Sequence, residues 1–132
     1  MISGITERGQ LVVQMQAHAL KGPDVVRFLK HVVCHIGGKL LIIWDGAPIH
    51  GDKAVKAFLV ARAGRQLRLE VLPGYAPDLN PDEGVWNHLK FVELRNVSCH
   101  DQGELRHQLR MAIARLRQKP DLIRGFLKQC GY

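Results

Sequence analysis

Residues 40–45 read Leu-Leu-Ile-Ile-Trp-Asp, and Gly46-Ala47-Pro48 follows them directly. A short apolar run that ends at a carboxylate and a turn predicts a strand over residues 39–44, buried on both faces of a parallel sheet. In such sheets, functional groups collect beyond the carboxyl ends of the strands. Asp45 stands at this end, and we therefore take it as the first candidate for a functional residue.

A second segment, residues 75–83, reads Tyr-Ala-Pro-Asp-Leu-Asn-Pro-Asp-Glu. Its prolines and Asn80 indicate a loop, and its last two residues are acids in the first turn of a helix. Of the two acids, Asp82 fits a helix-capping role better, and Glu83 is the candidate for metal binding. Carboxylate oxygens suit Mg²⁺ or Mn²⁺, and pairs of such ions drive phosphodiester chemistry. Asp45 and Glu83 are therefore candidate ligands of one divalent cation.

Hydrophobic periodicity and turn residues predict alternating elements along the chain. We expect strands at residues 1–6, 11–18, 39–44 and 67–72, and helices at residues 23–36, 52–63, 82–95, 101–119 and 121–129. This order predicts an α/β fold, in which a mixed sheet carries helices on both faces. On the helix over residues 82–95, Val85, Leu89 and Val92 should face the core. Helical spacing places Glu83, Asn87 and Lys90 together on another face.

The composition is that of an ordinary globular protein, with 132 residues, 46% hydrophobic and 23% charged. We expect no membrane span, because no apolar run is long enough. We expect no secretory signal, because residues 1–20 contain Glu7, Arg8 and three glutamines and end without a small-residue cleavage site. Cys34, Cys99 and Cys130 have no paired spacing, which favours a reduced intracellular chain over a disulfide framework or a zinc site. The formal charge of +7 favours a polyanionic partner such as nucleic acid.

Several polar side chains are candidates for contact with that partner. Lys90 lies about two turns from Glu83 and is placed to meet a phosphate. Three arginines line up beside the apolar stripe of the helix over residues 101–119, namely Arg106, Arg110 and Arg117. For these three, a solvated face and a contact with the DNA backbone are both open interpretations.

Each residue of the candidate site also has a purely structural interpretation. Asp45 could cap the loop that follows it, and Glu83 could be an acid that the helix dipole favours. His50 fits a role in fixing the loop as well as one in catalysis. Trp86 fits the core or the anchoring of its loop, and Asn80 is a further supporting residue.

Residues 40–50 and 72–90 together resemble the DDE transposases of the mariner superfamily, and within it the bacterial insertion-sequence branch. The resemblance spans roughly residues 1–95. It implies an RNase H-like catalytic core that uses Mg²⁺ to nick and join DNA. By the motifs, Asp45 matches the second acid of the catalytic triad and Glu83 matches the third. Three further residues match positions that follow these acids, namely His50, Trp86 and Lys90.

The resemblance also implies a first acid on the first strand of the core, upstream of a hairpin like residues 1–18. No Asp precedes Asp24, which opens a helix. We therefore expect the C-terminal part of a transposase catalytic domain, truncated so that the first strand is absent. A second-frame product and a decayed copy both fit. Residues 1–132 should form one domain, with a core over residues 1–95 and C-terminal helices over residues 96–132.

The resemblance implies transposon-end DNA as the partner, in the bacterial cytoplasm at the nucleoid. Activity would need another chain, either a second copy in a homodimer or a complementing N-terminal transposase chain that supplies the missing acid. The alternative is a non-catalytic module of the same fold that binds DNA or associates with itself. A phosphatase with an acid at a strand end is a more distant third interpretation.

Overall fold

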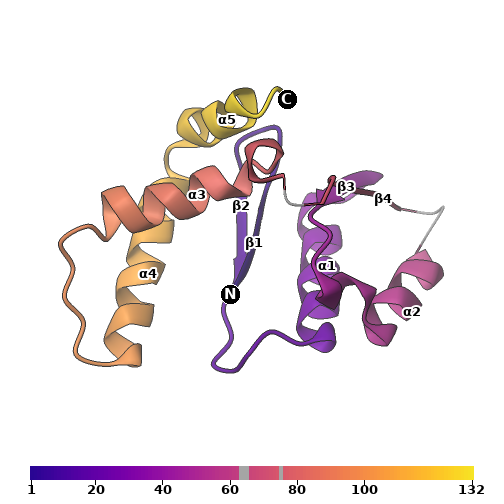
Figure 1. Cartoon of the computed structure of the whole chain (residues 1–132), viewed down its shortest axis with the longest axis horizontal. Helices are drawn as coiled ribbons and strands as arrows, with labels where there is room; N and C mark the ends of the chain where they lie inside the picture. Colours follow the sequence, from indigo (N-terminus) through magenta and orange to yellow (C-terminus); the bar gives the residue numbers. More distant parts are fainter. Residues whose placement is uncertain (63–65, 75) are drawn as a thin grey trace. The chain divides into compact units, whose positions relative to one another are not determined.

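The computed structural model describes residues 1–62, 66–74 and 76–132, which form two compact units. The first unit holds residues 1–3 and 12–76, and the second holds residues 4–11 and 77–132. Helices and short strands alternate (Figure 1), so the predicted α/β class is confirmed, and the elements are consistent with an RNase H-like domain. The units divide after residue 76, whereas the sequence suggested a boundary near residue 95; the single domain stays a prediction. None of the described helices is long and apolar enough to cross a membrane.

Strands β1 (Ile2–Ile5) and β2 (Leu11–Gln14) pair with each other as a hairpin. In the turn, the Gly9 N–H donates to the carbonyl of Thr6 at 2.9 Å, and Gly9 has a φ of 83°, which favours glycine. The prediction that the second strand extends to residue 18 is wrong. The strand stops at Gln14, because the chain then turns and brings His18 to the start of the next helix.

The other elements of the first unit alternate between helices and strands. In chain order they are α1 (Gly22–Ile36), β3 (Leu40–Trp44), the 3₁₀-helix η1 (Pro48–Gly51), α2 (Lys53–Arg62) and β4 (Leu67–Val71). The helix predicted over residues 52–63 is thus present, although residues 63–65 lie outside the described part. Strands β3 and β4 pair in parallel, in a register that runs from Leu40 opposite Leu67 to Trp44 opposite Val71.

The core of this unit joins α1 to α2 and to the sheet. Val25, Leu29 and Val55 are almost fully buried, and they form one cluster with Phe58 and Leu67. Alternate residues of β3 pack against this cluster from one face of the sheet. The helix predicted over residues 23–36 from its apolar periodicity is therefore confirmed.

The other face of β3 is open. Leu41 is 58% exposed and Ile43 is 43% exposed. Paired residues of parallel strands point to the same face, so Arg68 and Glu70 lie beside them. The prediction that this strand is buried on both faces is therefore wrong, because the core cluster of this unit covers only one of them.

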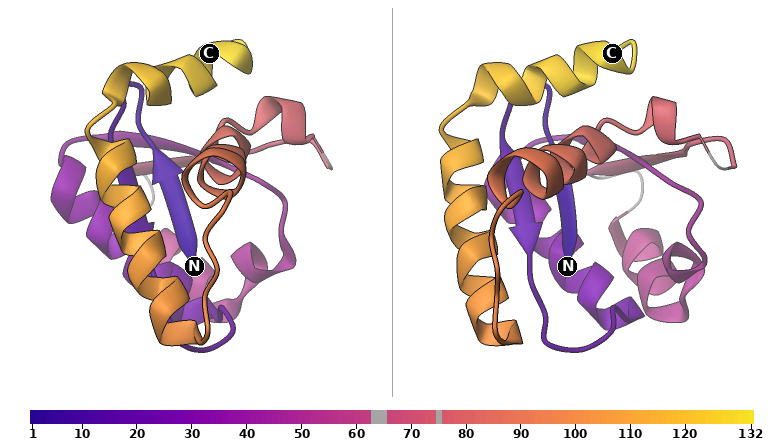
Figure 2. Two further views of the ribbon diagram at one scale, coloured as in Figure 1. Left: turned by 90° about the vertical axis from the view of Figure 1, so that its left-hand side faces the viewer. Right: turned by 60° about the vertical axis from the view of Figure 1, so that its left-hand side comes forward.

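The second unit is mainly helical. In chain order its elements are the 3₁₀-helix η2 (Pro77–Leu79), α3 (Asp82–His88), the π-helix η3 (Leu89–Glu93), α4 (Gln102–Arg117) and α5 (Pro120–Gln129). The chain turns sharply between α4 and α5 (Figure 2). Pro120 has no N–H to continue the first helix, and it occupies the first position of the second. Fully buried apolar side chains come from all three α-helices, namely Val85, Ala112, Leu116 and Ile123.

The helix predicted over residues 82–95 changes type at residue 89. The Leu94 N–H donates to the carbonyl of Leu89 at 3.0 Å, five residues back, as in a π-helix. This wider turn contains one more residue than an α-helical turn. The position that faces the core therefore moves by one residue after Leu89.

The shift in register explains one wrong prediction. Val85 and Leu89 are buried as expected, but Val92 is 63% exposed. The side chain of Glu93 is 9% exposed in its place, and the Arg115 Nε donates to its Oε2 at 2.7 Å. This hydrogen bond is the main cause that lowers the pKa of Glu93; burial opposes it, and a contact with His88 supports it. A buried charge thus ties the π-helix to α4.

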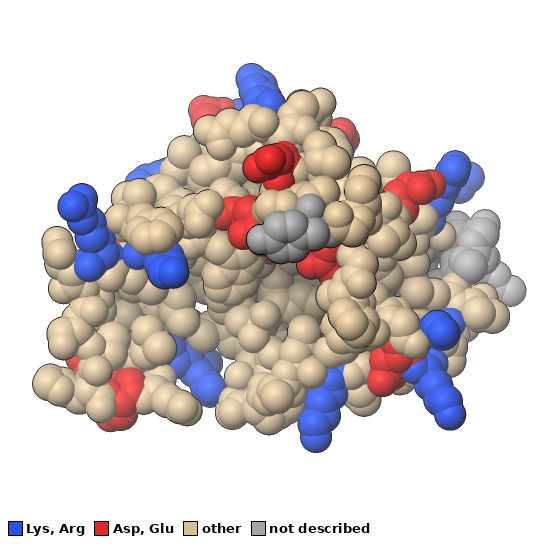
Figure 3. All heavy atoms as spheres, in the orientation of Figure 1, with Lys and Arg blue, Asp and Glu red and all other residues tan. Residues whose placement is uncertain are grey.

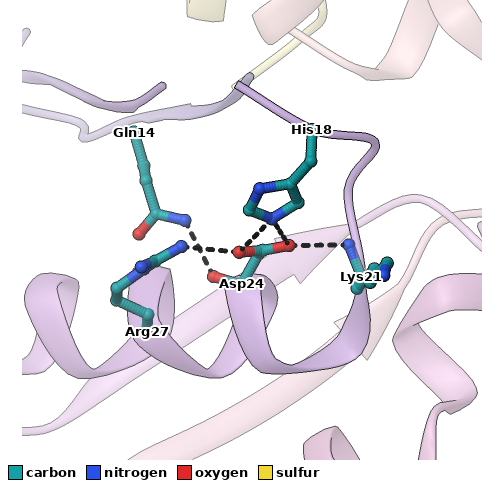
Figure 4. Close-up of polar contacts among 5 residues, drawn as sticks. All are labelled: Gln14, His18, Lys21, Asp24 and Arg27. Carbon is teal, nitrogen blue, oxygen red and sulfur yellow. Dashed lines mark hydrogen bonds and ion pairs between the residues drawn. The ribbon is translucent and has the colours of Figure 1, made fainter. Parts of the chain in front are cut away.

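Asp24 plays a similar role in the first unit, where four residues converge on it (Figure 4). Its Oδ2 accepts a hydrogen bond from the Lys21 N–H at 2.9 Å, and the His18 Nε2 lies 3.0 Å from the same oxygen. The Arg27 guanidinium contacts Oδ1, and the Gln14 amide donates to the Asp24 carbonyl at 2.9 Å. The Lys21 N–H is the main cause that lowers the pKa of Asp24, while burial opposes it and His18 and Arg27 add to it.

We expect Asp24→Asn to lower Tm by several degrees at pH 7. The pKa of Asp24 is lowered in the folded state, so this carboxylate contributes its full stabilisation above its ordinary pKa of about 3.9. That stabilisation is lost as the pH falls through the lowered pKa of the folded state. As the pH decreases below about 4, the Tm of the variant should therefore fall less steeply than the Tm of the wild-type protein. Thermal unfolding followed by circular dichroism measures both effects.

Asp121→Asn is the matched control. Asp121 also pairs with an arginine three residues on, Arg124, in the first turn of a helix, but its side chain is 88% exposed. Exposed pairs contribute little, so Tm should hardly change. A wild-type Tm and pH profile for Asp24→Asn would contradict this account of Asp24.

Candidate functional site

Asp45 directly follows β3, at the carboxyl end of the parallel pair. The Leu72 N–H donates to the Trp44 carbonyl at 2.8 Å and holds the backbone in place up to this point. The Asp45 Oδ1 accepts a hydrogen bond from the Ala47 N–H at 3.1 Å, and the His50 Nε2 lies 3.0 Å from the same oxygen. Within the described residues, no hydrogen bond engages Oδ2. The side chain is 57% exposed, so Oδ2 is open to a ligand.

His50 is held from two sides. Its ring stacks on the ring of Trp44, with centroids 4.0 Å apart and planes inclined by 14°. The side chain is 16% exposed, and its Nδ1 is buried with no partner in the described part of the chain. Trp44, expected in the core, is only partly buried and also supports this histidine.

Glu83 lies in the first turn of α3, as predicted, and is exposed. Its N–H donates to the carbonyl of Asn80 at 3.1 Å, and the Asn80 Oδ1 accepts a hydrogen bond from the Asp82 N–H at 3.2 Å. Asn80 therefore makes the side-chain contact at the start of this helix that we expected of Asp82. The Asp82 Oδ2 accepts a hydrogen bond from the Trp86 Nε1 at 3.2 Å, which anchors the tryptophan.

Gly84, next to Glu83, sets how closely two helices approach. A Cβ atom at this position would lie 2.7 Å from Cγ of Phe126 on α5, which is closer than such atoms come. The ring of Phe126 also lies 6.1 Å from that of His88, between centroids. This support of the Glu83 helix was not predicted, although a glycine inside a helix is a signal of close packing.

The face of α3 and η3 that was expected to carry Glu83, Asn87 and Lys90 is exposed. The Lys90 Nζ lies 5.2 Å from the centroid of the Phe91 ring, and Phe91 is itself 58% exposed. This exposed aromatic side chain beside a cation was not among the residues predicted from the sequence.

The three arginines of α4 differ in what they contact. Arg110 and Arg117 are exposed and Arg106 is partly buried. The Arg117 Nε donates to the carbonyl of Leu11 at 3.1 Å, so this side chain also supports the hairpin. On the face drawn in Figure 3, Lys and Arg side chains are scattered among Asp and Glu and form no single patch.

The structure thus brings the candidate residues together in two groups. Asp45 and His50 are in contact in the first unit, and Asn80, Asp82 and Trp86 form contacts around Glu83 in the second. That Asp45 and Glu83 bind one cation stays a prediction, because they belong to different units. No three His, Cys, Asp or Glu side chains among the described residues form a group suited to hold a metal.

The sequence was also compared with known proteins. Residues 1–106 match the family model described as DDE superfamily endonuclease, which covers 106 of the 132 residues and includes both candidate acids. No curated protein and no solved structure matches the chain. The chain therefore belongs to the DDE superfamily endonucleases.

Proposed function

We propose that this chain is part of a transposase catalytic domain that cleaves and joins DNA with Mg²⁺ or Mn²⁺. The proposal assigns it to the mariner superfamily and to its bacterial insertion-sequence branch, acting at the nucleoid. The observation that carries the proposal is the geometry at Asp45. This carboxylate stands at the end of a parallel strand with one oxygen hydrogen-bonded and the other open, in a chain of an endonuclease family.

The donor chemistry of this chain fits a hard divalent cation. Asp45 and Glu83 are exposed carboxylates in the part of the chain that matches the family, and Asp45 offers a free oxygen. Such ions prefer carboxylate oxygens. When bound, the ions supply an activated nucleophile and neutralise the charge that develops on the phosphate. Asp45 and Glu83 would hold them, while Lys90 would contact the phosphate backbone.

Two acids do not make a complete site of this family. The resemblance implies a triad of three acids, of which Asp45 and Glu83 match two, and the proposal therefore includes a further carboxylate from another chain. That chain is either a second copy or an N-terminal transposase chain. Alone, the protein would then bind DNA and metal weakly and cleave poorly. The alternative, a non-catalytic DNA-binding or self-associating module, differs because it predicts no metal binding at Asp45.

We expect Mn²⁺ to bind weakly, with a dissociation constant of about 10⁻⁴ to 10⁻³ M, because few charged oxygens contribute. Asp45→Asn and Glu83→Gln should each weaken binding, since each removes a charged ligand. Titration followed by the electron paramagnetic resonance signal of free Mn²⁺ measures this. Glu7→Gln, in the exposed hairpin turn, is the control and should bind like wild type. Equal binding by all four proteins would rule out the assigned ligands.

We expect duplex DNA to bind non-specifically, because the chain carries a formal charge of +7. The logarithm of the affinity should fall with the logarithm of salt concentration by about 0.9 for each phosphate contacted. Lys90→Gln and Arg110→Gln should each reduce this slope by about 1, whereas Arg68→Gln, on the open face of the sheet, should not. Fluorescence anisotropy over a salt series provides the measurement. Affinity that does not depend on salt would contradict the proposal.

We also expect the isolated chain to self-associate at micromolar concentration. In the described chain β3 pairs only with β4, so one edge of this apolar strand has no strand partner, and such edges recruit other chains. Ile43→Lys places a charge on the exposed strand and should shift the protein to monomer, whereas Val60→Lys, at a 79% exposed position of α2, should not. Light scattering after size exclusion measures the mass. A monomeric wild type would show that the edge is not used in this way.

A further inference from the structure

We infer that His50 is a positioning residue that fixes the Asp45 carboxylate so that Oδ2 alone is presented to a cation. The inference rests on the proposed function and assigns a role to a side chain that need not touch the metal or the DNA. It follows from three observations at the end of β3: how Oδ1 is engaged, how the imidazole is held, and which ring nitrogen lacks a partner among the described residues.

The first observation is that, among the described residues, both hydrogen-bond contacts of the Asp45 side chain go to one oxygen. The Ala47 N–H and the His50 Nε2 lie 3.1 Å and 3.0 Å from Oδ1. A carboxylate with two donors on one oxygen loses much of its freedom to rotate. The lone pairs of Oδ2 stay available, so a hard cation would be bound through this oxygen.

The second observation is that His50 is itself rigid. It stacks nearly parallel on Trp44, 4.0 Å between ring centroids, and only 16% of its side chain is exposed. It also lies within a short 3₁₀-helix, whose Asp52 N–H donates to the Ile49 carbonyl at 3.1 Å. A donor on such a support can hold Asp45 in one orientation, which an exposed and mobile side chain could not do.

The third observation fixes the tautomer. The His50 Nδ1 is buried and has no partner among the described residues. A proton there would be a buried donor without an acceptor, which is unfavourable. The ring therefore carries a proton on Nε2 and donates it to the Asp45 Oδ1. In metal sites generally, residues that do not bind the metal orient its ligands by hydrogen bonds. Removal of such a residue typically weakens metal binding by about 10- to 100-fold.

The experiment compares Mn²⁺ affinity at fixed pH in the full chain. His50→Leu fills similar space without a donor and should weaken binding about tenfold or more. His50→Gln keeps an N–H donor on a side chain of similar length and should recover most of the affinity. Circular dichroism selects variants that are folded, and His50→Ala serves as a second variant without a donor. If His50 only filled space, His50→Leu and His50→Gln should bind Mn²⁺ about equally. Higher Mn²⁺ affinity in His50→Gln than in His50→Leu therefore indicates that the N–H donor matters.

His18→Leu is the matched control. His18 also contacts an aspartate through Nε2, at 3.0 Å from Asp24, but that carboxylate is buried and is not a candidate ligand. This variant should bind Mn²⁺ like wild type. In addition, ¹⁵N NMR of the wild type without metal should show a protonated Nε2 and an unprotonated Nδ1 in His50.

The outcomes separate the inference from the proposed function. Wild-type affinity in folded His50→Leu or His50→Ala, or a His50 proton on Nδ1, overturns the inference and leaves the metal site standing. Loss of binding in His50→Gln as severe as in His50→Leu also overturns it. No Mn²⁺ binding by the wild type overturns the proposed function, and the inference with it.

Discussion

The backbone pairing of β3 with β4 is the constraint on which the candidate site depends. Five residue pairs in parallel register place the ends of both strands at the same edge of the sheet. Asp45 leaves one of these ends, and the segment that leads toward Glu83 leaves the other. An antiparallel pairing would send the two segments to opposite edges. Strand direction thus fixes where Asp45 stands, at the carboxyl ends of the parallel pair.

Four carboxylates show a division of roles in this chain. Asp24 and Glu93 are largely buried, each has an arginine and a histidine as neighbours, and the pKa of each is lowered. They hold the packing of their own units and have little contact with solvent. Asp45 and Glu83 are exposed, and Asp45 keeps an oxygen free. Burial and partners thus separate acids that maintain the fold from acids that can serve a ligand.

The sequence predicted the elements and the position of Asp45 well, because apolar periodicity and turn residues are local signals. It could not predict the exposed face of β3, which depends on what the rest of the unit covers. It also missed the inward position of Glu93, because the ion pair that favours it comes from Arg115, 22 residues away. The contact of Gly84 with Phe126 could not be predicted either, because these residues lie far apart in the sequence. Periodicity reports the average environment of a helix face, whereas these features depend on single contacts between distant residues.

The π-helix at Leu89–Glu93 has a consequence for how this chain tolerates changes in length. In an ordinary helix, loss of one residue rotates all later side chains by about 100° relative to the earlier ones. Here the surplus residue is already stored in the wide turn, and a deletion within it would produce a regular α-helix. Glu83 and the residues before the turn would keep their setting, and Glu93 would take the core-facing position of the regular helix and still meet Arg115. A deletion at this point thus leaves the two ends of the helix in phase, whereas the same deletion elsewhere in the helix would rotate Glu93 away from Arg115.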